Sequence, residues 1–119
     1  MLRWWNVGKL LTLRSVVIAS LQSPREKIWG MLLSINTYGI TIRGIDINSF
    51  QDWARSIANQ TESMGLSTMF IPMMRVEKVI LDETVGGYKS FSEQFYDRIG
   101  QDVKEFFDLG EDEIERIDL

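Results

Sequence analysis

The side chains that most enzymes use for acid–base and nucleophilic chemistry are missing from this sequence. Its 119 residues include no histidine and no cysteine, so the commonest general base, the thiol nucleophile and the usual zinc ligands are all absent. No serine is followed three residues later by lysine, which removes a further nucleophile arrangement. We therefore predict that the chain is not an enzyme and holds no cofactor.

Carboxylates are the remaining candidates for catalysis or metal binding. Asp82 and Glu83 are adjacent, and adjacent side chains on a strand point to opposite faces. The pair therefore fits a charged strand end better than a magnesium site. The acidic run at residues 111–113 lacks the alternating ligands and the central glycine of a calcium loop. A carboxylate enzyme that depends on a metal is kept as an alternative function.

A second candidate for chemistry is the segment in which two glycines precede Lys89 and Ser90. A lysine and a serine at a helix start could hold an anion, although neither glycine-rich phosphate fingerprint is present. Ser90 and Glu93 also have the spacing of a helix capping box. We favour the cap, because it explains the serine without a ligand.

The N-terminus combines cations with large aromatic rings, namely Arg3, Trp4, Trp5 and Lys9. Such a mixture is typical of single-stranded nucleic-acid binding or of an interfacial membrane anchor. We favour docking of the tryptophans on the domain or on a neighbouring subunit, since large aromatic residues usually anchor cores and interfaces. The alternative is a nucleic-acid binding protein that uses these four residues and Arg43.

Charge is distributed unevenly within a net charge of -4. Residues 1–30 carry five basic side chains and one acidic side chain, whereas residues 76–119 carry thirteen acidic and five basic ones. The two ends should attract each other, and the overall balance does not favour nucleic acid. Arg14 interrupts the apolar N-terminal stretch, so we predict no membrane span and no signal peptide. The lack of cysteine then favours a cytoplasmic location.

The apolar run from Phe70 to Met74 predicts an assembly surface. Successive residues of a strand face opposite sides, so this run needs cover on both faces. Proline is typical of an edge strand, and methionine is common at adaptable surfaces. We therefore expect the chain to form a homo-oligomer. The predicted interface residues are Phe70, Ile71, Met73 and Met74.

The elements that must position these residues can be read from the spacing of apolar positions and turn residues. We expect strands at residues 15–21, 27–35, 40–43, 68–71 and 75–81. A helix capped by Asn48-Ser49 should carry the stripe Phe50, Trp53, Ala54 and Ile57, and a second helix should run from the Ser90 cap to Gly100. The pattern predicts a single α+β domain over residues 1–119, with an acidic end at 110–119 that is helical only in part.

The middle of the chain contains a switch in the parity of its apolar residues. Ile40 and Ile42 share one face of a strand, but beyond Gly44 the apolar residues Ile45 and Ile47 have the opposite parity. A bulge or sharp bend at a glycine produces such a switch. We therefore predict a small, strongly bent antiparallel β-barrel.

Residues 27–50 resemble the first half of the Sm-like family. Gly39 and Gly44 have the family's spacing between a turn glycine and a bend glycine. Ile45 and Ile47 bracket the family's aliphatic position, and Phe50 lies one residue later than its aromatic position. The resemblance implies a bent five-stranded barrel that assembles into rings. The family's nucleotide pocket has an aspartate beside the aromatic residue and an asparagine soon after, whereas here Gln51 follows Phe50 and no asparagine comes soon after it. RNA binding is therefore not implied.

Together these observations predict a non-enzymatic, self-associating binding domain that works by surface recognition.

Overall fold

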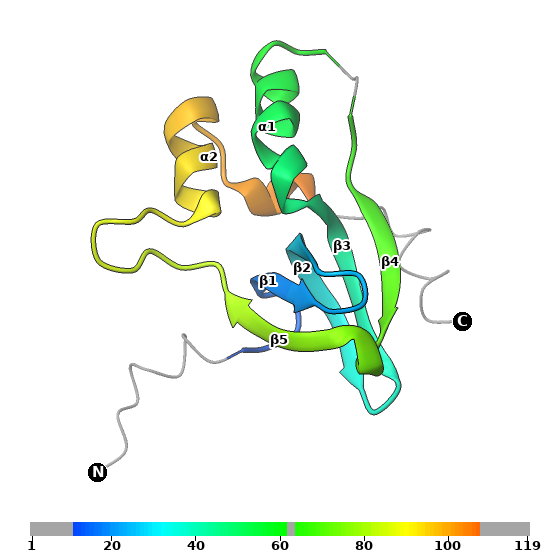
Figure 1. Cartoon of the computed structure of the whole chain (residues 1–119). Coiled ribbons are helices and arrows are strands. Elements are labelled where there is room, and N and C mark those ends of the chain that lie inside the picture. Colours follow the sequence, from blue (N-terminus) through cyan, green and yellow to red (C-terminus); the bar gives the residue numbers. More distant parts are fainter. Residues whose placement is uncertain (1–10, 62–63, 108–119) are drawn as a thin grey trace.

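The computed structural model describes residues 11–61 and 64–107, which form one antiparallel sheet and two α-helices (Figure 1). The predicted α+β class is confirmed. The elements are β1 (Val16–Leu21), β2 (Glu26–Asn36), β3 (Gly39–Asp46), α1 (Phe50–Ala58), β4 (Ser67–Pro72), β5 (Val76–Leu81) and α2 (Phe91–Ile99), with short 3₁₀ helices η2 (Ile47–Ser49), η3 (Met73–Arg75) and η4 (Val103–Phe106).

The order of the strands forces the sheet to curl. The sheet order is β4-β3-β2-β1-β5, so β4 and β5 are its two edges. Only Met73–Arg75 connects these edges. In a flat sheet the edges would lie roughly 19 Å apart, whereas three residues of 3₁₀ helix rise only about 6 Å. The curled sheet is nevertheless not closed into the predicted barrel, because among the described strands β4 pairs only with β3 and β5 only with β1.

Two hydrophobic cores lie on the two faces of the curled sheet. The inner core draws on all five strands, which places it inside the curl. Its buried members are Val17, Ala19, Leu21, Ile28, Leu32, Ile40, Ile42 and Ile71, with partly buried residues of β5 packed against them. The helices lie over one face of the sheet (Figure 1), and the helix-side core lies between them and the sheet. Its buried members are Val16, Trp29, Met31, Phe50, Trp53, Ala54, Phe95, Val103 and Phe107.

Trp29 is the centre of the helix-side core. Its ring lies 4.8 Å from that of Phe50, 5.6 Å from that of Trp53 and 5.2 Å from that of Phe107, measured between centroids. Aromatic pairs at such distances are favourable beyond the area they bury. The predicted apolar stripe of the first helix therefore packs directly on β2.

The helix caps agree with the sequence at one helix and differ at the other. Ser90 Oγ accepts a hydrogen bond from the backbone N–H of Glu93 at 3.0 Å, and Gly100 ends α2 in the left-handed conformation with φ 80°, as predicted. The predicted Ser49 cap is wrong, because that side chain makes no capping hydrogen bond. Asp46 instead caps the preceding 3₁₀ helix by accepting from the N–H of Asn48.

The parity switch on β3 has a different cause from the one predicted. The β2–β3 register runs unbroken past Gly44, and its one shift lies on β2 between Leu32 and Ser34. Ile42 packs in the inner core, whereas Ile45 packs against the helix-side core. The switch therefore marks a strand that is covered on both faces, and not an extra residue at the glycine.

Gly30 and Gly44 are nonetheless where the two backbones approach most closely. They are direct cross-strand partners and, by alternation, both face the inside of the curl. A Cβ atom on Gly44 would lie 2.0 Å from the carbonyl oxygen of Trp29, and one on Gly30 would lie 2.3 Å from that of Arg43. Only glycine fits at either position, because the obstructing atoms belong to the backbone.

We expect Gly44→Ala to lower the free energy of unfolding by about 3 kcal/mol, because overpacking against backbone forces the strands apart. Gly65→Ala is the matched control, since a Cβ there would have no atom within 4 Å, and it should change stability by less than about 0.5 kcal/mol. Urea unfolding followed by tryptophan fluorescence measures both. Equal stabilities for the two variants would show that the close approach is unimportant.

Candidate functional site

Asp82 joins the end of β5 to α2 and to the helix-side core. One carboxylate oxygen accepts from the backbone N–H of Phe91 at 2.8 Å. The other accepts from the backbone N–H and the hydroxyl of Ser92, at 2.9 and 2.7 Å, and from the indole N–H of Trp29 at 3.1 Å. Both oxygens are thus used in holding the fold together. This position explains Asp82 without catalysis.

The N-terminus of α2 already has its anion. The carboxylate of Asp82 accepts from the N–H groups of Phe91 and Ser92, and Ser90 Oγ accepts from that of Glu93. These are three of the free donors that make a helix N-terminus attractive to phosphate. The interpretation of this segment as a cap is therefore confirmed, and these three donors are not open to a ligand.

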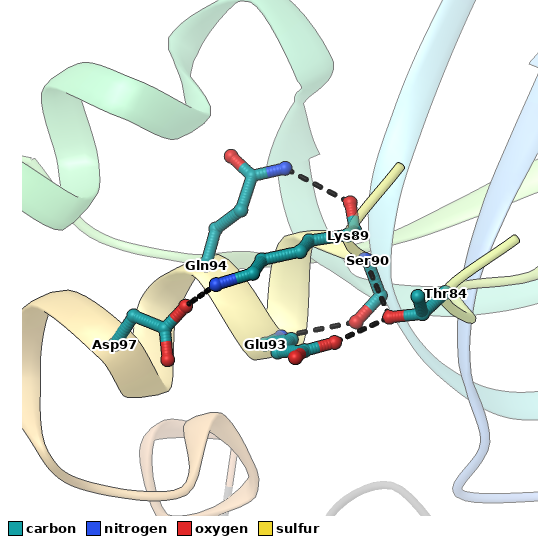
Figure 2. Close-up of polar contacts among 6 residues, drawn as sticks. All are labelled: Thr84, Lys89, Ser90, Glu93, Gln94 and Asp97. Atoms are coloured by element: carbon teal, nitrogen blue, oxygen red, sulfur yellow. Dashed lines mark hydrogen bonds and ion pairs between the residues drawn. The ribbon is translucent and has the colours of Figure 1, made fainter. Parts of the chain in front are cut away.

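A polar network holds the loop before α2 against the helix (Figure 2). The Thr84 hydroxyl donates to the Glu93 carboxylate and accepts from the backbone N–H of Ser90 at 3.1 Å. Glu93 therefore does not complete the capping box by reaching back to Ser90. Thr84 stands between the two residues instead.

Lys89 forms the second half of this network (Figure 2). Its Nζ lies 2.5 Å from a carboxylate oxygen of Asp97, and Gln94 donates to its backbone carbonyl at 3.0 Å. The hydrogen bond and the negative charge of Asp97 raise the pKa of Lys89 above its ordinary value of 10.5. Lys89, the lysine of the candidate phosphate-binding loop, therefore holds that loop against α2.

One recess lies between the end of β5 and the segment around η4. It has a volume of about 400 Å³, and Glu83 and Asp102 line it beside Asp82. Asp102 accepts from the backbone N–H of Lys104 at 2.9 Å and so caps η4. The described residues contain no group of three acidic side chains placed to hold a metal ion.

The four predicted interface residues are divided between the core and the surface. Ile71 is buried in the inner core of its own chain, and Met73 packs against that core. Phe70 is 56% exposed and Met74 is 81% exposed. On β4, strand alternation separates exposed Phe70 from buried Ile71. In η3, Met74 is exposed whereas Met73 packs inward, so Phe70 and Met74 are the two that are free to meet a partner.

The two open edges of the sheet each carry one exposed apolar residue on the same face. Phe70 on β4 pairs with Thr41, and Ile80 on β5 pairs with Ile18. The registers through β2 place both side chains on the face that also bears the helices. Ile80 is 45% exposed. The sequence did not single out Ile80, because only the strand order reveals that β5 is an edge.

Four of the five predicted nucleic-acid contacts, Arg3, Trp4, Trp5 and Lys9, lie outside the described residues. The fifth, Arg43, lies on β3, and its Nη1 donates to the hydroxyl of Thr68 on β4 at 3.1 Å. Its Nε is buried and has no hydrogen-bond partner within the described chain. The structure therefore does not bring these five residues together into a described surface. The acidic end at 110–119 lies outside the described residues as well.

Comparisons with models of protein families, with curated proteins and with solved structures found no match. The Sm-like resemblance therefore rests on the residues of this chain alone. In the part of the chain that the structure describes, neither helix has the length and apolar character needed to cross a bilayer.

Replacing Asp82 with alanine should lower the free energy of unfolding by about 3 kcal/mol, because it leaves partly buried donors of Trp29 and α2 unpaired. The neighbouring Glu83→Ala is the control. Glu83 makes no hydrogen bond in the described structure, so its removal should cost less than about 0.5 kcal/mol. Chemical denaturation measures both, and an equal loss would mean that the carboxylate of Asp82 is not the link that holds α2.

The contact between Lys89 and Asp97 should stabilise the fold only while the lysine is charged. Because folding raises the pKa of Lys89, its contribution is complete below about pH 10.5 and is lost as the pH rises through the higher folded value. We expect Lys89→Gln to melt slightly below the parent at pH 9, and the two melting curves to converge at higher pH. Asp97→Asn should behave alike, and a gap that persists above pH 12 would contradict the assignment.

Proposed function

We propose that this protein is a non-enzymatic, self-associating scaffold or binding domain, in which the β4 edge of one copy pairs with the β5 edge of the next. The single observation that carries the proposal is the pair of open edges, each with a half-exposed apolar residue on the same face. Unpaired strand edges are ready templates for another chain. Its cysteine-free sequence suits the reducing cytoplasm.

The β4 edge has little protection against pairing. Its sequence, Ser-Thr-Met-Phe-Ile-Pro, contains no charged residue, whereas natural edge strands are usually blocked by charge, bulges or cover. Proline blocks only the end of the strand. On β5, Glu77 and Lys78 lie near one end, and the rest of the strand is apolar. Both strands therefore favour pairing over their apolar parts.

Pairing between two different edges has a consequence for symmetry. Each copy would offer β4 to one neighbour and β5 to another, which is a head-to-tail contact that closes into a ring when the rotation permits. The Sm-like resemblance also implies ring assembly. The sheet that one chain leaves open would then be continued by its neighbours.

We expect light scattering coupled to size exclusion to give a mass that is a multiple of 13.8 kDa for the parent chain. Phe70→Asp should block β4 and Ile80→Asp should block β5, because a buried charge at a strand interface is unfavourable. Tyr96→Asp on α2 is the control, since Tyr96 is 58% exposed, close to the value for Phe70.

A mixture of the two blocked variants tests which edges pair. Phe70→Asp keeps an intact β5, and Ile80→Asp keeps an intact β4, so the mixture should contain dimers although each variant alone is monomeric. A single pair lacks the extra stability of a closed ring, so the mixture is measured well above the concentration at which the parent chain assembles. Failure to form the mixed dimer there would contradict β4–β5 pairing. A strictly monomeric parent at micromolar concentration would overturn the proposed self-association as a whole.

A further inference from the structure

A second recess lies where the β1–β2 hairpin meets β5. Its volume is about 200 Å³, below the roughly 300 Å³ at which pockets for whole small-molecule ligands begin. It therefore has room for a single chemical group. The residues that line it are Ser20, Leu21, Arg25, Glu26, Lys27, Glu77 and Lys78.

Ser20 contributes a hydroxyl to this recess. The residue as a whole is only 7% exposed, and its side chain makes no hydrogen bond to any residue that the structure describes. Its oxygen is not one of the fully enclosed atoms that lack a partner, so it is open to the recess. Ser20 therefore offers a hydrogen bond to whatever enters the recess.

Two lysines flank Ser20 in a row across three strands. Ser20 is the direct partner of Lys27 on β2 and of Lys78 on β5, and directly paired residues project from the same face with Cβ atoms about 5 Å apart. Neither lysine forms an ion pair with a described residue, and the same holds for Arg25 on the hairpin.

The charge of the recess is positive in a protein whose net charge is -4. Of its two carboxylates, Glu26 is already held by Arg75 at 3.1 Å. Three cations then remain against Glu77 alone. A doubly negative group in the recess would be attracted by all three cations and would accept a hydrogen bond from the serine.

We propose that this recess binds a phosphate dianion, with the Ser20 hydroxyl donating to one oxygen and Lys27 and Lys78 approaching others from the two sides. A tetrahedral phosphate has enough oxygens and enough charge for all three groups, whereas a carboxylate carries one charge on two oxygens. The phosphate could be free or could be a monoester on a larger molecule. The site shares β5 with the proposed edge pairing, but it uses Lys78 at the charged end of that strand and not the apolar part.

The test is titration of the full ¹⁵N-labelled chain with sodium phosphate, and separately with glycerol 3-phosphate, while sodium chloride keeps the ionic strength constant. We expect the backbone amide signals of Ser20, Lys27 and Lys78 to shift and to saturate at millimolar concentration. Tighter binding of glycerol 3-phosphate identifies a monoester ligand, and equal binding identifies the phosphate group alone as the recognised unit.

Four variants distinguish phosphate binding in the recess from general electrostatic attraction to the protein surface. Ser20→Ala should weaken binding roughly tenfold, because it removes a hydrogen bond to a charged oxygen. Lys27→Gln and Lys78→Gln, both exposed and tolerant of change, should each weaken it several-fold. Lys104→Gln removes an exposed lysine outside the recess and should leave binding unchanged. Circular dichroism checks that each variant is folded.

Two results would overturn the proposal. One is the absence of phosphate-specific shifts at constant ionic strength, which would mean that the lysines respond only to bulk salt. The other is a loss on Lys104→Gln as large as the losses on Lys27→Gln and Lys78→Gln, which would mean that net charge and not the recess controls binding. The two lysine variants decide the matter even where Ser20→Ala fails to fold.

Discussion

The three-residue link between β4 and β5 is the constraint on which the rest of the structure depends. These strands are the outer edges of a five-stranded sheet, yet η3 is too short to connect them unless the sheet curls. Curling encloses the inner core and brings the backbones of β2 and β3 together, where Gly30 and Gly44 lack the Cβ that would collide. It also leaves the helix-side face convex, so that face needs the separate cover that α1, α2 and η4 provide.

The helices that cover this face must be held on the sheet, and Asp82 holds α2 there. A carboxylate placed at the end of an edge strand satisfies the first donors of α2 and the indole of Trp29 at the same time. The sheet and the second helix are thereby joined through one side chain at the centre of the helix-side core. The chemistry that makes an acidic residue a candidate for catalysis is here used for folding, and the same holds for Lys89, which is bound to Asp97.

Local pattern was enough to predict the elements but not their arrangement. The strand expected at 15–21 is observed at Val16–Leu21, and the stop at Gly100 is where α2 ends, because alternation, capping and glycine conformation act over a few residues. Strand order depends on contacts between distant residues, such as Asp82 with Trp29, which are 53 positions apart. The sequence therefore could not show that Ile80 lies on an edge or that Ile71 is used within its own chain.

The apolar pattern of β3 shows the same limit of prediction from sequence within a single strand. A shift from Ile42 to Ile45 has two physical causes, an inserted residue or burial on both faces, and the sequence pattern is identical for the two. Here β3 crosses from the inner core to the helix-side core without a break in register at Gly44. The sheet is curled, but the bulge that the same observation predicted at Gly44 is absent.

Edge pairing would have to draw on more than the exposed side chains. Covering half-exposed Phe70 and Ile80 contributes about 1 kcal/mol each, whereas association costs about 4 to 15 kcal/mol in lost freedom of motion. Backbone hydrogen bonds along both strands would have to offset part of the remaining free-energy cost of association. A closed ring would offset more of it, because its last contact joins chains that are already held together. On this accounting Phe70 and Ile80 would determine which edges meet, and closure into a ring would strengthen the assembly. An isolated pair of copies would then be the weakest form of the assembly.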